Sequence, residues 1–279
     1  MIQSIKSTTK LFALFGHPVS HSLSPAIQNQ LIKQVGDDAV YLAFDIENDD
    51  VEKAVSSIRA LSIAGVNVTA PHKQAVIPYL DEIHEKAKKF RAVNVIKNDK
   101  GHLIGYNTDV EGLFMYLKTQ NITICSKDVL ILGAGGLASS LLTGIWDENP
   151  KSVSVINRTA QKAIELADRI GNELHQPIAT TLKGTPYDIV INAATAGMHP
   201  HEDTCALESL DGIIDRHTVV VDSIYNPQKT LLLKRAEEVG ATIFNGFGML
   251  ICQALLSYEI FTNQKLSPAI YDKFIHIQF

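Results

Sequence analysis

The sequence predicts an α/β protein with two domains, each built around a sheet of largely parallel strands. Apolar runs of strand length alternate with amphipathic segments of helix length along the whole chain, which is typical of this class. A length of 279 residues suits two medium domains better than a single small one. With 46% hydrophobic and 20% charged residues, the chain can bury a sizeable core.

The first part of the chain shows clear signals for where helices start. Ser24 and Pro25 have the residue types of an N-cap and of a first helical position. Thr108 and Glu111 have the spacing of a capping box. The expected strands here are residues 11–15, 40–44 and 65–68, and a hairpin of residues 93–96 with 103–106. The expected helices are residues 25–34, residues 49–61, a helix after Pro71 and a helix from Thr108.

The second part begins near Lys127 and repeats the alternation. Its expected strands are residues 128–132, 153–156, 188–192, 218–222 and 241–244, and its expected helices are residues 136–146 and 159–170. A largely apolar helix over residues 249–262 follows, and we expect it to pack against the first domain. We therefore predict one domain of residues 1–109 plus 246–279 and a second domain of residues 110–245.

The bulk charge and the cysteine pattern narrow the classes of function. A formal net charge of -5 argues against a general nucleic-acid binder. Three cysteines without a C-x-x-C pair favour a reduced, cytoplasmic protein. Residues 1–10 lack the apolar run of a signal peptide, and we expect no segment that spans a membrane. His199 and His201 have no further ligands at metal-binding spacing, so we expect no metal site.

A glycine-rich segment joins a predicted strand to a predicted helix. The run Gly133-Ala-Gly135-Gly136-Leu-Ala138 matches the G-x-G-x-x-A pattern of dinucleotide-binding domains. There the first glycine makes a tight turn, the second admits the pyrophosphate and the last small residue lets helix and strand pack closely. We therefore predict a Rossmann-like domain whose cofactor-binding residues include Gly133, Ala134, Gly135, Gly136 and Leu137.

The end of the next strand indicates which dinucleotide binds. NAD sites usually carry an acid there for the ribose 2′-hydroxyl, whereas this strand ends in Asn157-Arg158-Thr159. Arg158 can bind a phosphate through two N–H groups, and Lys162 lies on the same helix face one turn later. We predict NADP as the cofactor, with Asn157, Arg158, Thr159 and Lys162 at this end of the site.

Two titratable residues follow predicted strands, where open α/β sheets bind ligands. Lys73 comes after the strand at residues 65–68, and Asp109 comes after the second strand of the hairpin. A lysine paired with an aspartate can donate and accept a proton. Each residue also has an ordinary explanation, as a surface lysine and as an acid that favours a helix N-terminus.

A set of motifs covers nearly the whole chain in a fixed order. It includes Asn67-Val-Thr69-Ala-Pro71-His-Lys73 and Asn107-Thr108-Asp109. The full set occupies residues 16–25, 65–73, 105–112, 133–136, 157–159, 192–198, 222–227 and 246–253. Together these motifs resemble the shikimate dehydrogenase family, the NADP-dependent shikimate 5-dehydrogenases. The chain departs from the family pattern at Arg91, where glycine is usual, and at Val95, where threonine is usual.

The resemblance implies roles for individual residues. Lys73 would transfer the proton, with Asp109 as its partner. The substrate would be bound by Ser22, Ser24, Thr69, Asn94, Asp109, Tyr225 and Gln253. Ser223 and Gly246 would complete the cofactor site. The fold implied is an N-terminal α/β substrate domain with a mostly parallel sheet, joined to a Rossmann-like NADP-binding domain.

The activity we expect is reversible hydride transfer between NADPH and the 3-keto group of 3-dehydroshikimate, giving shikimate on the route to chorismate and the aromatic amino acids. One alternative is a quinate/shikimate dehydrogenase that uses NAD. Another is a non-catalytic small-molecule sensor on the same fold, which would have no reason to keep both Lys73 and Asp109. We expect a small-molecule substrate and no nucleic-acid or membrane partner. The sequence is also compatible with a homodimer.

Overall fold

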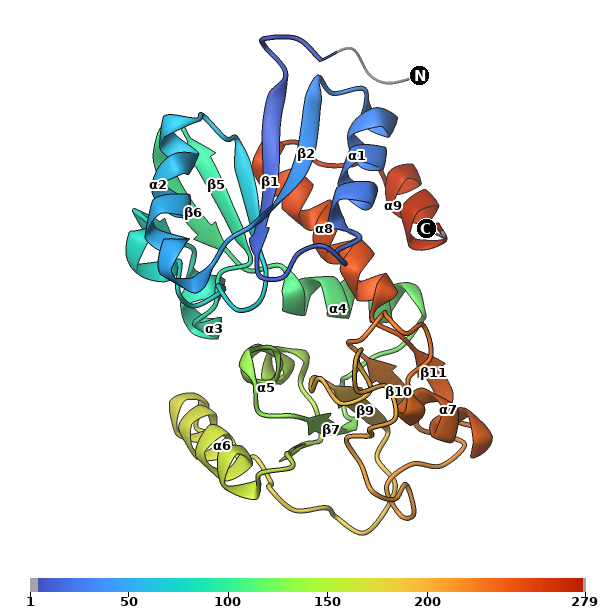
Figure 1. Cartoon of the computed structure of the whole chain (residues 1–279). Coiled ribbons are helices and arrows are strands. Elements are labelled where there is room, and N and C mark those ends of the chain that lie inside the picture. The colour runs from blue at the N-terminus through green and yellow to red at the C-terminus, as the bar shows by residue number, and fades with distance from the viewer. Residues whose placement is uncertain (1–4, 278–279) are drawn as a thin grey trace. The chain divides into compact units, whose positions relative to one another are not determined.

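The computed structural model describes residues 5–277 (Figure 1). Residues 1–4 and 278–279, which belong to the predicted first domain, lie outside the described residues. The chain forms two compact units. Unit 1 comprises Met1–Leu113 with Leu250–Phe279, and unit 2 comprises Phe114–Met249. That unit 1 binds the substrate and unit 2 binds the cofactor stays a prediction.

Unit 1 contains a mixed six-stranded sheet in the order β2-β1-β3-β5-β6-β4. The strands are β1 (Lys10–Gly16), β2 (Ala39–Asp45), β3 (Gly65–Val68), β4 (Glu82–Ile83), β5 (Val95–Asp99) and β6 (His102–Tyr106). β1 pairs in parallel with β2 and β3, whereas β5 runs antiparallel to β3 and β6. The predicted hairpin is confirmed by the antiparallel pairing of β5 with β6. In its turn, Lys100 and Gly101 both have positive φ (53° and 95°), as a tight hairpin turn requires.

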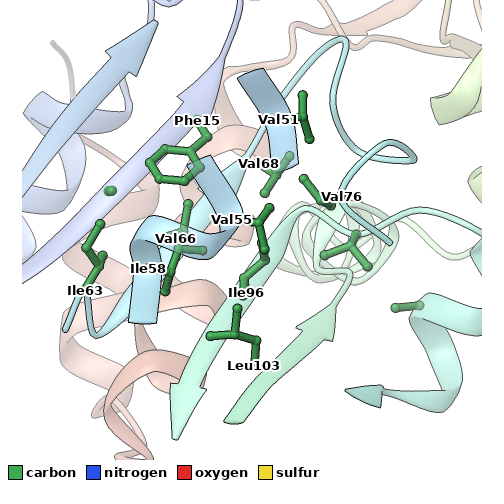
Figure 2. Packing of buried hydrophobic residues seen from close by; sticks show 13 residues of the cluster. Phe15, Val51, Val55, Ile58, Ile63, Val66, Val68, Val76, Ile96 and Leu103 are labelled. Atoms are coloured by element: carbon green, nitrogen blue, oxygen red, sulfur yellow. The ribbon is translucent and has the colours of Figure 1, made fainter. Parts of the chain in front are cut away.

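Helices cover both faces of this sheet. They are α1 (Ser24–Val35), α2 (Val51–Ala60), α3 (Glu85–Phe90), α4 (Asp109–Thr119), α8 (Phe247–Thr262) and α9 (Pro268–Ile275). Successive side chains of a strand point to opposite faces. Phe15 of β1 therefore packs with Val55 and Ile58 of α2, as Figure 2 shows. Phe12, on the other face, stacks on Phe261 of α8 at a centroid distance of 5.1 Å.

The outer edge of β2 is closed by a side chain of α1. Asn29 donates through Nδ2 to the carbonyl oxygen of Tyr41 at 2.8 Å and accepts from the Tyr41 N–H at 2.9 Å. One carboxamide thus satisfies both backbone groups that Tyr41 directs away from β1. Edge strands with open backbone groups invite pairing with other chains, so this contact protects the sheet.

Three local expectations for unit 1 are wrong. No α-helix starts directly after Pro71. Residues 70–76 form turns and lead into a 3₁₀ turn (Ile77–Tyr79), where Pro78 has no N–H to continue a helix. Ser24 is not the N-cap, because α1 begins at Ser24 itself and Leu23 occupies the cap position. The capping box is replaced by other contacts, since the Thr108 hydroxyl bonds to groups outside α4 and Glu111 pairs with Lys86.

Unit 2 contains a parallel five-stranded sheet in the order β11-β10-β9-β7-β8. The strands are β7 (Asp128–Leu132), β8 (Ser152–Ile156), β9 (Ile189–Asn192), β10 (Val219–Asp222) and β11 (Thr242–Phe244). The helices are α5 (Gly136–Ile145), α6 (Ala160–Leu174) and α7 (Leu231–Glu238), the last of which was not expected from the sequence. The strand order reverses direction at β7, and the carboxyl ends beside such a reversal are where open sheets bind ligands.

A charged network lies at the amino end of β7. The Asp128 carboxylate accepts hydrogen bonds from Lys183 Nζ at 2.8 Å, Lys151 Nζ at 3.0 Å and Ser152 Oγ at 2.6 Å. Burial alone raises the pKa of Asp128, but these donors together hold it well below its usual range. The network therefore joins β7 to β8 at the end of the sheet opposite the glycine-rich turn.

The three cysteines, Cys125, Cys205 and Cys252, are free thiols. None of the helices in the described part of the chain is both long and apolar enough to cross a membrane.

Candidate active site and cofactor site

The glycine-rich turn of unit 2 has the backbone that its sequence predicts. Gly133 has a φ of +111°, and a Cβ built on it would lie 3.0–3.1 Å from the backbone of residues 193–194. This conformation and this space both require glycine. A Cβ built on Gly135 or Gly136 meets no heavy atom of the described residues within 4 Å, so the start of α5 is open to a ligand. Ala138, in contrast, is fully buried where α5 packs on the sheet.

The loop after β8 carries the two predicted cations. Arg158 and Lys162 are exposed, and in residues 5–277 neither forms an ion pair. Thr159 occupies the N-cap position of α6 without a side-chain cap bond, and Asn157 Nδ2 donates to its carbonyl oxygen at 3.0 Å. The loop therefore presents two uncompensated positive charges and the start of a helix, a combination that suits a phosphate.

Two further predicted residues of unit 2 lie against each other. A Cβ on Gly246 would come within 2.0 Å of the Ser223 carbonyl oxygen, so only glycine fits beside this loop. The loop is anchored by the fully buried Asp222, which accepts hydrogen bonds from Thr230 Oγ1 at 2.6 Å and Asn192 Nδ2 at 3.0 Å. Tyr225 lies in the same loop and is partly buried.

The predicted proton-transfer pair is formed in unit 1. Lys73 Nζ donates to Asp109 Oδ2 at 2.6 Å, and the two side chains are 32% and 11% exposed. The other oxygen, Oδ1, accepts from Asn94 Nδ2 at 2.8 Å. The pair is brought together by backbone bonds, because the Val93 N–H donates to the Lys73 carbonyl at 2.8 Å. Asn107 Oδ1 accepts from the Asp109 N–H and fixes the first turn of α4.

The predicted serine loop meets the Lys73 turn at the ends of β1 and β3. The His17 N–H donates to the Ala70 carbonyl at 3.0 Å. A Cβ on Gly16 would lie 2.2 Å from Thr69 Cγ2, so this close approach needs glycine. Ser22 Oγ accepts from the Ser24 N–H at 3.2 Å and steadies the start of α1. Ser22, Ser24 at the start of α1, and Thr69 therefore lie on two segments that are held side by side.

Gln253 of α8 lies beside the start of α4. A Cβ on Gly112 would lie 2.8 Å from Gln253 Cβ, which lets the two helices approach closely. The Thr108 hydroxyl lies 3.3 Å from the Gln253 carbonyl oxygen. Of the residues that we expected to bind substrate, unit 1 thus gathers Ser22, Ser24, Thr69, Asn94, Asp109 and Gln253, whereas Tyr225 belongs to unit 2.

The two departures from the family pattern flank Asn94 without displacing it. Arg91 ends α3 with a φ of +53°, a left-handed conformation that glycine adopts more easily. Val95 is fully buried in β5 and pairs with Tyr106 of β6. Asn94 itself is 2% exposed. Its Nδ2 donates to Thr108 Oγ1, and its Oδ1 accepts from the Thr108 N–H.

The sequence reasoning missed polar residues behind the pair. Asn67, Thr108 and Ser257 are all buried and are hydrogen-bonded to one another or to Asn94. A usable signal existed for Asn67, since a lone amide inside the apolar strand Gly65–Val68 must find a partner in the core. Among residues 5–277, no group of three or more His, Cys, Asp or Glu side chains is arranged to hold a metal ion.

Comparison with known proteins finds relatives that cover most of the chain. Residues 14–96 match the family described as the shikimate dehydrogenase substrate binding domain, and residues 117–227 match the shikimate / quinate 5-dehydrogenase family. A shikimate dehydrogenase (NADP(+)) of Geobacillus kaustophilus is 42% identical over 91% of this chain and 93% of its own.

Solved structures extend the similarity to three dimensions. A shikimate dehydrogenase in complex with NADP+ is 36% identical, with a TM-score of 0.89 over 98% of this chain and 96% of that one. A shikimate 5-dehydrogenase of Listeria monocytogenes, in complex with shikimate and NAD, is 31% identical, with a TM-score of 0.87 over 99% of both chains. The predicted fold class, α/β with two domains of which one is Rossmann-like, is confirmed. The sheet of unit 1, which we expected to be mostly parallel, is mixed, because β5 runs antiparallel to both of its neighbours.

Proposed function

The chain belongs to the shikimate dehydrogenase family, and we propose that it catalyses the reversible, NADP-dependent reduction of 3-dehydroshikimate to shikimate. The observation that carries the proposal is the hydrogen bond from Lys73 Nζ to Asp109 Oδ2, with Asn94 on the other carboxylate oxygen. A reductase that turns a ketone into an alcohol needs one group that supplies a proton to the oxygen, and Lys73 has the chemistry for it.

The residues of unit 2 fit a bound dinucleotide. Gly133 makes the turn, while Gly135 and Gly136 leave open space at the N-terminus of α5, where backbone N–H groups favour a pyrophosphate. Ala134 and Leu137 complete this turn, and Ser223 with Gly246 forms a second loop of the same unit. We assign these residues to cofactor binding. The cofactor, when bound, supplies or accepts the hydride.

The loop after β8 favours NADP over NAD. Arg158 can hold a 2′-phosphate with two parallel N–H donors, and Lys162 adds a second charge one turn along α6. The strand has no acid at its end for a free ribose 2′-hydroxyl, so it lacks the group that NAD sites use. Asn157 and Thr159 hold the shape of this loop through their own hydrogen bond.

In the proposed chemical step, the proton that the substrate oxygen gains comes from Lys73. Lys73, as an ammonium, donates a proton to the carbonyl oxygen as the hydride reaches the carbon, and the product is a secondary alcohol with a neutral amine. Asp109 orients Lys73 and stabilises its charge through the 2.6 Å hydrogen bond. The amine regains a proton from solvent, which its 32% exposure allows. In the oxidative direction Lys73 accepts the proton instead.

The substrate carboxylate would be held by neutral donors, and the ring hydroxyls by a hydroxyl, two amides and one carboxylate. We assign the carboxylate to Ser22 and Ser24 with Tyr225, and the ring hydroxyls to Thr69, Asn94, Asp109 and Gln253. A polyhydroxylated ring requires several placed hydrogen-bonding groups, and an analogue that lacks one of the hydroxyls would leave a protein group unpaired. Such a set discriminates strongly between related acids.

The direct test is an initial-rate assay of nicotinamide reduction with purified protein. We expect turnover with shikimate and NADP, and slower turnover with NAD or with quinate. Rates at least as high with NAD as with NADP would contradict the cofactor assignment. A preference for quinate would point to a quinate/shikimate dehydrogenase. Measurable binding of shikimate without turnover would favour the sensor alternative.

A further inference from the structure

A buried chain of hydrogen bonds leads from the core of unit 1 to the catalytic pair. We propose that Thr108 is a positioning residue: its backbone N–H and its hydroxyl together fix the orientation of the Asn94 carboxamide, and thereby of Asp109 and Lys73. This inference rests on the proposed function, because it concerns residues that serve the same reaction. Thr108 is fully buried, so it acts through Asn94 and not by contact with a ligand.

The outer part of the chain of hydrogen bonds runs from Tyr41 through Asn67 to Ser257. The Tyr41 hydroxyl donates to Asn67 Oδ1 at 2.9 Å. Asn67 Nδ2 then donates its two hydrogens to Ser257 Oγ at 2.9 Å and to the Asn94 carbonyl oxygen at 3.3 Å. Ser257 donates its hydrogen to the Gln253 carbonyl at 2.7 Å. With its hydrogen on the Gln253 carbonyl, the Ser257 oxygen is free to accept from the Thr108 hydroxyl, whose oxygen lies 3.3 Å away.

The inner part inherits this direction. The Thr108 hydroxyl has one hydrogen, whose acceptors in reach are Ser257 Oγ and the Gln253 carbonyl at 3.3 Å and Asn94 Oδ1 at 3.4 Å, so its oxygen keeps a lone pair for another donor. Asn94 Nδ2 fills that acceptor at 3.0 Å with one hydrogen and donates the other to Asp109 Oδ1 at 2.8 Å. Asn94 Oδ1 accepts from the Thr108 N–H at 2.8 Å.

A flipped carboxamide would break the bonds to the Thr108 N–H and to Asp109 Oδ1 at once, and the Thr108 hydroxyl would have to turn its hydrogen away from Ser257 and Gln253 to meet the amide oxygen. Its N–H groups would face the Thr108 N–H, and its oxygen would face the Asp109 carboxylate. Unsatisfied or repelling polar groups in a buried site are costly, so the observed orientation is strongly selected. The consequence is that Asp109 always receives a donor on Oδ1, and its Oδ2 is held toward Lys73. Thr108 thus specifies which way the pair points.

The choice of threonine can be tested with near-isosteric variants. Thr108→Val keeps the shape and the backbone N–H but removes the hydroxyl that accepts from Asn94. Thr108→Ser keeps the hydroxyl. Thr262→Val is the matched control, because the Thr262 hydroxyl on α8 donates to a carbonyl one turn back, that of Tyr258, outside the chain of bonds.

The kinetic experiment compares kcat and KM of the full-length enzyme with shikimate and NADP. We expect Thr108→Val to lower kcat about 10- to 100-fold with KM changed much less, because misplacement of a reacting group acts on the chemical step. We expect Thr108→Ser and Thr262→Val to stay near the wild type. A Thr108→Val enzyme with wild-type kcat, or one whose loss matches only a lowered folded fraction, would overturn the proposal.

A second measurement does not depend on the substrate. In protein with 15N-labelled asparagine, the Asn94 side-chain signal is assigned by its loss in Asn94→Ser. We expect both Asn94 amide hydrogens to be protected from exchange in the wild type and in Thr108→Ser, and one of them to lose protection in Thr108→Val. Unchanged protection refutes the positioning role. If protection changes as expected while wild-type protein fails to turn over shikimate, the positioning stands and the proposed reaction falls.

Discussion

Asn94 and Lys73 approach the Asp109 carboxylate from two different elements, one on each oxygen, at 2.8 Å and 2.6 Å. Asn94 precedes β5, and Lys73 lies in the turns after β3. The Val93 N–H donates to the Lys73 carbonyl, and the Val68 N–H of β3 donates to the Asn94 carbonyl. The lysine is therefore held by the sheet even though it lies in a loop. This placement makes the role of Lys73 the first to test.

Replacing Lys73 with alanine removes the proton donor. We expect kcat to fall by about 10² to 10⁴, the usual contribution of a general acid, with a smaller effect on the affinity for shikimate. Steady-state kinetics with shikimate and NADP measures both. Lys53→Ala serves as the control, because Lys53 forms only an exposed ion pair with Asp50. Near-normal turnover of the Lys73 variant would remove the lysine from the mechanism.

Replacing Arg158 with alanine tests the cofactor preference. Charge-assisted hydrogen bonds contribute about 1.5–3 kcal/mol, so we expect KM for NADP to rise roughly 10- to 100-fold. KM for NAD should hardly change, because NAD has no 2′-phosphate. Arg235→Ala on α7, a partly buried arginine with a long contact to a carbonyl, is the control. An equal loss with both cofactors would mean that Arg158 holds the loop and does not select the phosphate.

Asp128 should make stability depend on pH at the acid end. Its pKa lies below the usual range in the folded protein, so the ionised carboxylate contributes stability above the unfolded-state pKa of about 4. That contribution is lost as the pH falls through about 4 toward the folded-state value. We expect Asp128→Asn to lower the free energy of unfolding by about 2 kcal/mol at neutral pH and to flatten its dependence on pH below 5.

Urea unfolding at a series of pH values measures this effect. Asp50→Asn is the comparison, since Asp50 is half exposed and its ion pair with Lys53 contributes little. If the free energy of unfolding falls equally in both variants at neutral pH, the network around Asp128 contributes no more to stability than an exposed ion pair does.

Asn29 should protect the edge of β2. Asn29→Ala leaves the outward N–H and carbonyl of Tyr41 without their partner, and we expect a loss of about 1–3 kcal/mol in unfolding free energy. Gln30→Ala, an exposed neighbour on α1, should stay within about 0.5 kcal/mol of wild type. Chemical denaturation compares the two. A harmless Asn29→Ala would show that water replaces the carboxamide at this edge.

Local patterns were enough to predict most of the strands and helices. The limits of β3 and β7 were predicted to the residue, because each is a short apolar run bounded by turn residues. The glycine-rich turn was predictable for the same reason, since Gly133 and its neighbours act on adjacent residues. The helix after Pro71 failed because a favourable start cannot outweigh a proline a few residues later.

The site could be predicted from the sequence only in part. The resemblance named Lys73, Asp109 and Asn94, and the structure brings them into contact. The hydrogen bond from Asn67 to Ser257 joins residues 190 positions apart, and no local pattern reports such a contact. Thr108 was predicted to cap α4 from its spacing, but its hydroxyl serves tertiary partners instead. Long-range polar contacts depend on the fold as a whole.

The stacking of Phe12 on Phe261 has a consequence for how the protein is made. As the chain leaves the ribosome, β1 and β3 emerge long before the helix that carries Phe261, and a bulky apolar face of the nascent sheet stays without its cover until α8 has emerged. Phe114–Met249, in contrast, is continuous and can fold as soon as it has emerged. Unit 1 is therefore completed only after unit 2 has emerged, and we expect its uncovered apolar face to be the part of the nascent chain most open to aggregation.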